Sequence, residues 1–418
     1  MKKMLPGFAL LRFITIFLVL SYFVPGTQAR AGVRVGKTVY YSGRGDYLYI
    51  DEDFPRQVRT CLGIIEKSLI EDGLTIENVV KCYVYLDDLD NFPAMNEVYK
   101  EFFKKDFPAR TTLDTGILPG YEKNGAHVEI TVIAYSDLSE KKVIGSPPPG
   151  YPFSPGILAG NTLYISGQGD HLPNGDHPAT FEEQVRQSLR NVGKVLKEAG
   201  IDYNNVVMSH VFLDEEGNNN SAIVNKVYSE FFEYGNEPAR ATVYVDKLPA
   251  GCHVEITCYA TTDLSNRVLI RPHSMKYGPG GTAPTASPGV LVGDTLHLSS
   301  QVGMHPINGI AAGDLTTQTH QMMQNHLDVL RAAGMGFEDL VTGYVYLRDM
   351  KDYRAFNALY NPYFSTNPNV RGATRTCVQD NSGYVKDDVM VTTTFIFAQP
   401  EEEKGIKGVK TKWKRTTR

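Results

Sequence analysis

The chain has 418 residues, of which 42% are hydrophobic and 21% are charged, as is typical of folded globular domains. This length allows roughly two to four domains, each with its own core. The formal net charge of −5 argues against a general nucleic-acid-binding surface, because such surfaces usually carry a basic excess.

The N-terminus has the pattern of a secretory signal peptide. Lys2 and Lys3 precede an apolar run at 13–24, and Ala29-Arg30-Ala31 matches an A-x-A cleavage site. We therefore predict a signal peptide at 1–31 and a periplasmic or secreted mature protein. An uncleaved membrane anchor is the alternative, although Arg12 interrupts the apolar region. No later stretch approaches ~20 apolar residues, so no membrane span is expected after signal cleavage.

The rest of the chain repeats itself three times with a period of roughly 130 residues, which suits a domain rather than a solenoid repeat. We place the repeats at 32–144, 145–270 and 271–399. The lysine-rich and arginine-rich segment 400–418 is predicted to be a disordered tail. Three homologous domains in one chain suggest a covalent trimer.

Each repeat begins with a short strand that ends at a small hydroxyl residue, namely Ser42, Ser166 or Ser299. An amphipathic helix follows, because apolar residues recur at helical spacing. In the first repeat these are Val58, Leu62, Ile65 and Leu69. A glycine is expected to end each helix in a left-handed conformation: Gly73, Gly200 and Gly334.

A second strand, a second helix and two more strands complete each repeat. The second strands are expected at 79–86, 206–213 and 340–347, and the last strands at 127–135, 253–259 and 390–398. The second helix is rich in aromatic residues and carries one asparagine, which is Asn96, Asn225 or Asn357. Each repeat is thus predicted to have the order β, α, β, α, β, β, an α+β arrangement.

One arginine occupies the same place in every repeat, between the aromatic helix and the last strand. The segment 108–112 returns at 238–242 and, more loosely, at 373–377, so that Arg110, Arg240 and Arg375 correspond. A guanidinium can pair with both oxygens of a carboxylate, which makes these arginines candidate anchors for a small acid. A structural salt bridge is the alternative interpretation.

Glu129 and Glu255 follow in identical His-Val-Glu-Ile-Thr segments. A carboxylate near an anchored acid could orient or deprotonate water, whereas a glutamate on a solvent-facing strand would do neither. Strand alternation places His127 beside Glu129 on one face, so a His–Glu metal site is a third interpretation. The third repeat has Met390 and Thr392 at these two places, which speaks against it.

The five cysteines are an odd number and lack C-x-x-C spacing, so no disulfide framework is predicted. Cys252 and Cys258 are expected to lie in the core or in a site wall rather than to bind zinc. His326 lies on the apolar stripe of its helix and is expected to be a core histidine. We predict no metal and no cofactor.

Four motifs together closely resemble the Rid family (RidA/YjgF, also called endoribonuclease L-PSP). They are Ser-Gly-Gln-Gly at 166–169, Asn-x-Val-Tyr-x-x-Phe-Phe at 225–232, Pro-Ala-Arg at 238–240 and Val-Glu-Ile at 254–256. The resemblance covers nearly all of 32–399 three times over, and the middle repeat fits best. It implies chorismate-mutase-like domains that form a monomeric pseudo-trimer, with a central β-barrel, outer helices and ligand clefts between neighbouring repeats.

The resemblance also implies an activity, the hydrolytic deamination of small 2-imino acids, such as 2-iminobutanoate and 2-iminopropanoate, to 2-keto acids and ammonia. Arg110, Arg240 and Arg375 would hold the carboxylate of the imino or keto acid, and Glu129 and Glu255 would position the attacking water. Other residues match positions that line the family's pocket: Ser42, Ser166, Ser299, Asn96, Asn225, Asn357, Thr112, Thr242 and Cys377.

Two departures from the family pattern limit these expectations. A tyrosine near the N-terminus of active members becomes Phe153 in the middle repeat and aligns with Ala286 in the third, and Thr392 replaces the glutamate of the third repeat. Three equally competent sites are therefore not expected, and a group lost from one repeat can disable a cleft shared with its neighbour.

Two other functions stay open. The first is a non-catalytic module that binds a small carboxylate or a protein, which export from the cytoplasm favours. The second is an endoribonuclease, against which the acidic charge balance and the lack of a catalytic histidine pair both argue.

Overall fold

The computed structural model describes residues 32–46, 53–119, 126–214, 220–275, 285–309, 313–365, 373–380 and 389–399. The predicted signal peptide at 1–31 and the predicted tail at 400–418 lie outside the described residues. Within the described residues, no helix is both long and apolar enough to cross a membrane.

The first repeat forms a six-stranded sheet with two helices. Its elements are β1 (Val33–Val35), β2 (Thr38–Tyr40), β3 (Arg44–Gly45), α1 (Phe54–Glu71), β4 (Val79–Leu86), α2 (Phe92–Phe102), β5 (Ala109–Asp114) and β6 (Val128–Tyr135). The strand order is β1-β2-β6-β4-β5, and β3 also pairs with β6. Only the β4–β5 pair in this sheet is parallel.

The second and third repeats follow the same plan in seven-stranded sheets. The second contains β7 (Lys141–Ile144), β8 (Gly156–Ala159), β9 (Thr162–Ile165), β10 (Gln168–Gly169), α3 (Phe181–Glu198), β11 (Val206–Leu213), α5 (Ser221–Tyr228), β12 (Ala239–Tyr244) and β13 (Val254–Thr261). The third contains β14 (Arg267–Ile270), β15 (Gly289–Val292), β16 (Thr295–Leu298), β17 (Gln301–Val302), α6 (Leu315–Ala333), β18 (Leu340–Leu347), α7 (Tyr353–Tyr360), α8 (Pro362–Ser365), β19 (Thr374–Gln379) and β20 (Val391–Ala398). Short 3-10 turns lie between them at Ile76–Asn78, Leu89–Asn91, Leu138–Glu140, Tyr203–Asn205, Pro249–Gly251, Phe337–Asp339 and Met350–Asp352.

The predicted order β, α, β, α, β, β is confirmed in all three repeats, and the second strands begin and end at the predicted residues. The sheets of the second and third repeats begin slightly earlier in the chain than the predicted boundaries at 144 and 270. Strands β7 and β14 form hairpins with β8 and β15 and so join the sheet of the following repeat. The hairpin pairing decides which sheet these two strands join, and no motif of the repeat indicates that pairing in the sequence.

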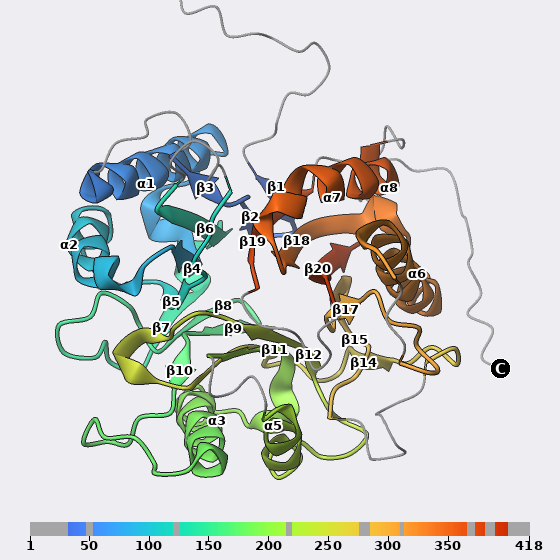
Figure 1. Cartoon of the computed structure of the whole chain (residues 1–418). Coiled ribbons are helices and arrows are strands. Elements are labelled where there is room, and N and C mark those ends of the chain that lie inside the picture. The colour runs from blue at the N-terminus through green and yellow to red at the C-terminus, as the bar shows by residue number, and fades with distance from the viewer. Residues whose placement is uncertain are drawn as a thin grey trace, which may run out of the picture. The chain divides into compact units, whose positions relative to one another are not determined.

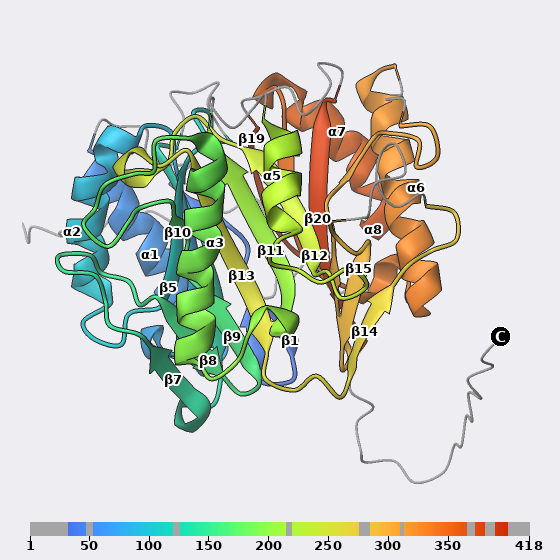
Figure 2. The same cartoon turned by 90° about the horizontal axis from the view of Figure 1, so that it is seen from below.

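Each first helix packs its predicted apolar stripe against the sheet. The side chains of Val58, Leu62, Ile65 and Leu69 have no exposed area. The three glycines after these helices have φ of 74°, 78° and 73°, a left-handed conformation that a Cβ would strain. Figure 2 shows α3 lying along β11 and β13, and Figure 1 shows helices on one face of the sheet in each repeat.

The opposite faces of the three sheets contribute to one shared hydrophobic core. The middle strands β4, β11 and β18 are buried along all eight residues. Their corresponding residues Tyr83, His210 and Tyr344 contact one another, with ring centroids 5.9, 5.4 and 5.6 Å apart. The Tyr83 hydroxyl also lies 3.1 Å from His210 Nδ1. Equivalent residues of all three repeats therefore meet at one place.

Strand pairing among the described residues stays within the three sheets, apart from an isolated bridge between Asp114 and Lys247. The described strands thus form three separate sheets that share a core, and continuous pairing does not close them into a barrel. His326 is the predicted core histidine, since it is fully buried and its Nε2 lies 2.8 Å from Thr393 Oγ1. All five cysteines are buried and unpaired, so the absence of a disulfide framework is confirmed.

Candidate functional site

Each predicted arginine lies at a boundary where the next repeat binds its backbone. The backbone nitrogens of Arg110 and Arg240 donate to the hydroxyls of Ser166 and Ser299, each at 2.8 Å. Arg375 closes the cycle, because its nitrogen donates to Ser42 Oγ of the first repeat at 3.2 Å. We refer to these places as the 1–2, 2–3 and 3–1 boundaries.

The predicted serines therefore join repeats through the main chain. Ser166 and Ser299 also donate their hydroxyl protons to the carbonyls of Ser154 and Ser287, each at 2.6 Å. A hydroxyl that donates to one backbone group and accepts from another has little capacity left for a ligand. Direct substrate binding by these serines stays a prediction, whereas their contact with the arginine strand is observed.

At the 1–2 boundary, Arg110 is 3% exposed and its guanidinium lies among three aromatic rings. Its Cζ is 5.5 Å from the ring centroid of Phe92, 4.9 Å from Tyr99 and 5.2 Å from Phe153. Arg110 forms no ion pair with the described residues, and its Nη2 has no hydrogen-bond partner among them. A buried guanidinium with an unused donor can bind an anion, and a structural salt bridge does not account for it.

Phe153 takes the place where active relatives of the Rid type were expected to carry a tyrosine. Its ring covers the Arg110 guanidinium and also lies 6.0 Å from the ring of Tyr151. The departure noted in the sequence therefore replaces a hydroxyl at the 1–2 boundary with an apolar face.

Glu255 of the second repeat completes this boundary. It is 6% exposed, and its Oε1 is buried without a hydrogen-bond partner among the described residues. Burial raises the pKa of Glu255 to about 8, while the positive charges of Lys81 and Arg110 oppose that shift and Asp170 adds to it. Lys81 and Arg110 both belong to the first repeat, so the charges around Glu255 come from two repeats.

A glycine creates the space for this carboxylate. A Cβ at Gly167 would lie 1.7 Å from Glu255 Oε1. At the 3–1 boundary a Cβ at Gly43 would likewise lie 1.9 Å from Glu129 Oε1. A side chain at either position would therefore force the glutamate carboxylate to move from its place.

Sequence reasoning missed Lys81, which is fully buried. Its Nζ donates to Thr111 Oγ1 at 2.8 Å, to Thr257 Oγ1 at 2.8 Å and to the Ile165 carbonyl at 2.9 Å. Burial lowers the pKa of Lys81 to about 7. A single lysine in an otherwise uncharged, apolar and aromatic strand was the signal that could have identified it.

At the 3–1 boundary, Arg375 and the glutamate of the first repeat both lie close enough to Cys377 to act on its thiol. Burial raises the pKa of Cys377 to about 12, with Arg375 lowering it and Glu129 raising it, so both charges act on this thiol. The Arg375 guanidinium lies 5.2 Å from the ring centroid of Tyr360, and its Nη2 donates to the Tyr353 hydroxyl at 3.4 Å. The looser arginine motif thus lies at a boundary that has a glutamate.

The 2–3 boundary is different. Arg240 donates from Nη2 to Asn225 Oδ1 at 2.7 Å, and Thr285 Oγ1 donates to the same oxygen at 3.1 Å. The strand position that carries glutamate elsewhere is Thr392, which is 1% exposed. The best-matching arginine motif therefore lies at the boundary where threonine takes the place of the glutamate.

The remaining predicted residues lie close to the arginines in the fold. Thr112, Thr242 and Cys377 lie two positions after each arginine on the same strand and are buried. Asn225 contacts Arg240 directly, whereas Asn96 and Asn357 each have an Oδ1 without a hydrogen-bond partner among the described residues.

The two histidines of the repeated His-Val-Glu segments pair with aspartates. His127 Nδ1 contacts Asp87, and His253 Nδ1 lies 2.7 Å from Asp214 Oδ2. These aspartates follow the middle strands. The pairing gives each histidine a structural partner, so the alternative of a His–Glu metal site is not needed to explain it.

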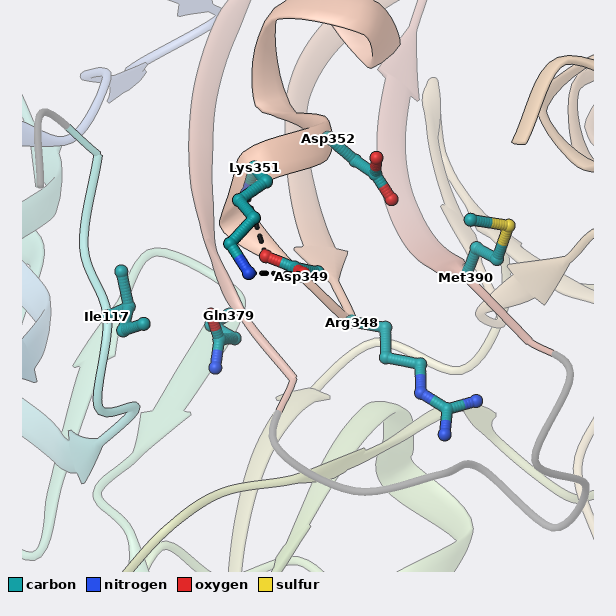
Figure 3. A pocket seen from close by; sticks show the side chains of 7 residues that line it. All are labelled: Ile117, Arg348, Asp349, Lys351, Asp352, Gln379 and Met390. Atoms are coloured by element: carbon teal, nitrogen blue, oxygen red, sulfur yellow. Dashed lines mark hydrogen bonds and ion pairs between the residues drawn. The ribbon is translucent and has the colours of Figure 1, made fainter. Parts of the chain in front are cut away.

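A separate pocket of about 460 Å³ lies outside these boundary sites (Figure 3). It is lined by Ile117, Arg348, Asp349, Lys351, Asp352, Gln379 and Met390. Lys351 Nζ is 3.5 Å from Asp349 Oδ2, which neutralises part of its charge. The predicted arginines and glutamates do not line this pocket, so its size does not make it the functional site.

Comparison with known proteins identifies relatives of this chain. The mouse protein 2-iminobutanoate/2-iminopropanoate deaminase is 40% identical over 111 residues, which cover 26% of this chain and 80% of the relative. The human protein of the same name is 38% identical over 111 residues, with 26% and 79% covered. A RutC family protein of Saccharolobus solfataricus is 41% identical over 86 residues, with 20% and 68% covered.

A chorismatase crystal structure matches with a TM-score of 0.56 and 14% identity, over 77% of this chain and 93% of that one. That likeness concerns the fold alone. The family model described as Endoribonuclease L-PSP matches residues 26–136, 144–262 and 281–397. The chain therefore belongs to the Endoribonuclease L-PSP family, the group that includes RidA, and contains three tandem copies of its domain.

Proposed function

We propose that this protein hydrolyses small 2-imino acids to 2-keto acids and ammonia at its 1–2 and 3–1 boundaries. One observation carries the proposal: the Arg110 guanidinium acts on Glu255 from the adjoining repeat, and each of these buried groups has an atom without a hydrogen-bond partner among the described residues. An anion-binding group beside a carboxylate is what water addition to an imino acid requires.

The chemistry follows from these two groups. The guanidinium holds the carboxylate of the substrate, which places the imine carbon near the glutamate. The glutamate takes a proton from water as the water oxygen bonds to that carbon and the C=N π electrons move to nitrogen. The glutamate returns this proton to nitrogen, which gives a neutral carbinolamine. The glutamate then takes the hydroxyl proton and passes it to nitrogen as the oxygen forms the C=O bond and the C–N bond breaks, so that the keto acid and ammonia leave.

We further propose that the three repeats form the single-chain counterpart of a trimer around a central barrel-like core. The cyclic order of the arginine–serine contacts and the meeting of Tyr83, His210 and Tyr344 support this arrangement. We also propose that the N-terminal segment directs export to the periplasm or the medium, and that the substrate is formed or delivered there.

The 2–3 boundary supports a second, narrower role. Arg240 can hold a carboxylate there, but Thr392 supplies no base, so this boundary binds small acids without turnover. The chain would then combine two hydrolytic sites with one binding site.

The test is the release of ammonia and keto acid from 2-iminopropanoate generated in situ by oxidation of alanine. We expect the purified protein to accelerate release above the spontaneous rate, as the mouse deaminase should in the same assay. Calorimetry with pyruvate measures binding separately. Binding without any acceleration would reject hydrolysis and leave the binding role.

A further inference from the structure

Four side chains with metal-binding atoms gather in the second repeat, outside the arginine sites. Asp170 and His171 directly follow β10, His177 lies in the loop before α3, and Cys252 follows the turn Pro249–Gly251. Their candidate ligand atoms all lie within 4.8 Å of one another. Asp170 is fully buried and Cys252 is 2% exposed.

The distances suit a tetrahedral ion with few adjustments. Cys252 Sγ is 3.2 Å from His171 Nδ1, and His177 Nδ1 is 2.7 Å from Asp170 Oδ1. Zinc bonds of ~2.0–2.1 Å to nitrogen and ~2.3 Å to sulfur separate neighbouring ligand atoms by about 3.3–3.8 Å. The aspartate–histidine pair would have to open by less than about 1 Å, a side-chain movement, to reach that range.

The orientation of His177 gives an independent indication. Its Nε2 lies 3.1 Å from the Ala250 carbonyl, which can only accept, so Nε2 carries the proton. In a neutral ring, Nδ1 then presents a lone pair to the Asp170 carboxylate. Two acceptors at that distance need a shared proton or a metal ion between them. A histidine that binds a metal ion through one ring nitrogen usually donates its other ring N–H to a group such as a backbone carbonyl.

The other two repeats show whether the fold itself needs these four residues. The strand pairs Gly169–Glu255, Gly45–Glu129 and Val302–Thr392 align the three repeats. On that alignment, Cys252 becomes Ala126 in the first repeat and Val389 in the third. Asp170 and His171 become Gly303 and Met304 in the third repeat. The first repeat keeps an aspartate, Asp46, at the position of Asp170, but the third repeat forms the same strand pairing without the aspartate, the histidine at 171 or the cysteine, so the fold itself does not require them.

We propose that Asp170, His171, His177 and Cys252 bind a single divalent transition-metal ion of the zinc type. A thiolate, two imidazoles and one carboxylate form a donor set suited to zinc, and four protein ligands make a closed, structural site. The ion would fasten the loop that contains His177 to the start of β13. This proposal departs from the expectation that Cys252 lies in the core or in a site wall rather than binds zinc.

Cobalt(II) substitution tests this proposal on the full chain. After treatment with a chelator, Co(II) alone is added in stoichiometric steps. We expect one equivalent to bind, with intense tetrahedral ligand-field absorption and a thiolate-to-cobalt charge-transfer band. Zn(II) should displace the cobalt and raise the melting temperature of the chelator-treated protein.

Variants assign the ligands. Cys252→Ala should abolish the charge-transfer band and weaken Zn(II) binding at least tenfold, and His171→Gln should weaken binding while keeping the band. Cys258→Ala, which removes a buried cysteine six residues away, is the matched control and should keep both properties. Circular dichroism checks that each variant is folded.

The proposal is overturned if the folded native chain takes up no stoichiometric Co(II), or if Cys252→Ala and Cys258→Ala behave alike. It is also overturned if NMR of the native chain with Zn(II) present shows both ring protons on His177, since this would identify a plain imidazolium–aspartate pair.

Discussion

Pairs of substitutions at the boundaries test which arginine works with which glutamate. We propose that Arg110 works with Glu255 and Arg375 with Glu129, each across a boundary, because Arg110 acts on the pKa of Glu255 and both Arg375 and Glu129 act on the pKa of Cys377. Arg→Met removes the charge and roughly keeps the side-chain volume, and Glu→Gln removes the base with little change of shape.

The size of the effect follows from burial. Loss of a buried charge-assisted contact with substrate costs about 2–5 kcal/mol, and about 3 kcal/mol corresponds to a ~100-fold loss of kcat/KM at one boundary. Either single substitution at the 1–2 boundary therefore silences that boundary and leaves the activity of the 3–1 boundary. Arg110→Met combined with Glu255→Gln should lose no more than either alone, because both act on one site.

A combination across the two boundaries has a different outcome. Arg110→Met together with Glu129→Gln disables both sites and should reduce keto-acid formation to about 1% of the native rate. Arg240→Met serves as the control and should leave turnover unchanged while lowering pyruvate binding in calorimetry.

Steady-state keto-acid formation from 2-iminopropanoate measures all of these variants. If each arginine worked with the glutamate of its own repeat, Arg110→Met with Glu129→Gln would retain as much activity as either single variant. That result, or a loss of turnover in Arg240→Met, would refute the assignment across the boundaries.

Three further predictions concern the 1–2 boundary and the core. When the 3–1 boundary is inactivated, turnover should rise with pH, with a midpoint near pH 8. The reason is that the base form of Glu255 appears only above its raised pKa. The charged groups that face Glu255 are Lys81, Arg110 and Asp170. A midpoint near the usual glutamate value of ~4.3 would contradict the reasoning. Gly167→Ala should abolish activity at the same boundary, since its Cβ would overlap the glutamate. As the control, Gly63→Ala on α1 meets no atom within 4 Å and should leave activity intact. Equal activity of the two variants would contradict this prediction. Leu62→Ala should lower the free energy of unfolding by about 2–5 kcal/mol in urea titrations, because the side chain is fully buried, and a loss below about 1 kcal/mol would show that the site repacks.

Much of the fold could be read from local patterns. Apolar residues at helical spacing predicted the first helix of every repeat, and glycine stereochemistry predicted where those helices end. Runs of β-forming residues located the middle strands at their observed bounds. These features depend on residues close together in the chain, so the sequence contains the information directly.

The site could be predicted only as a set of residue types. The arginines, glutamates and small flanking residues were identified, and the middle repeat matched the family motifs best. In the fold, the glutamate position of the third repeat is Thr392, whereas Arg375 with its looser motif acts on the same thiol as Glu129. How closely the motifs of one repeat match the family does not indicate which residue the next repeat places at their shared boundary.

The sequence alone therefore determined the three repeats, their elements and the residue types that carry the chemistry. The tertiary structure decided which repeats combine at each boundary, that Lys81 lies buried beside Glu255, and that Asp170 meets Cys252. The physical reason is that helical and strand periodicity depend on neighbours a few residues apart. Contacts between repeats depend on how whole sheets pack, and one rigid packing brings together side chains that are many residues apart in the chain.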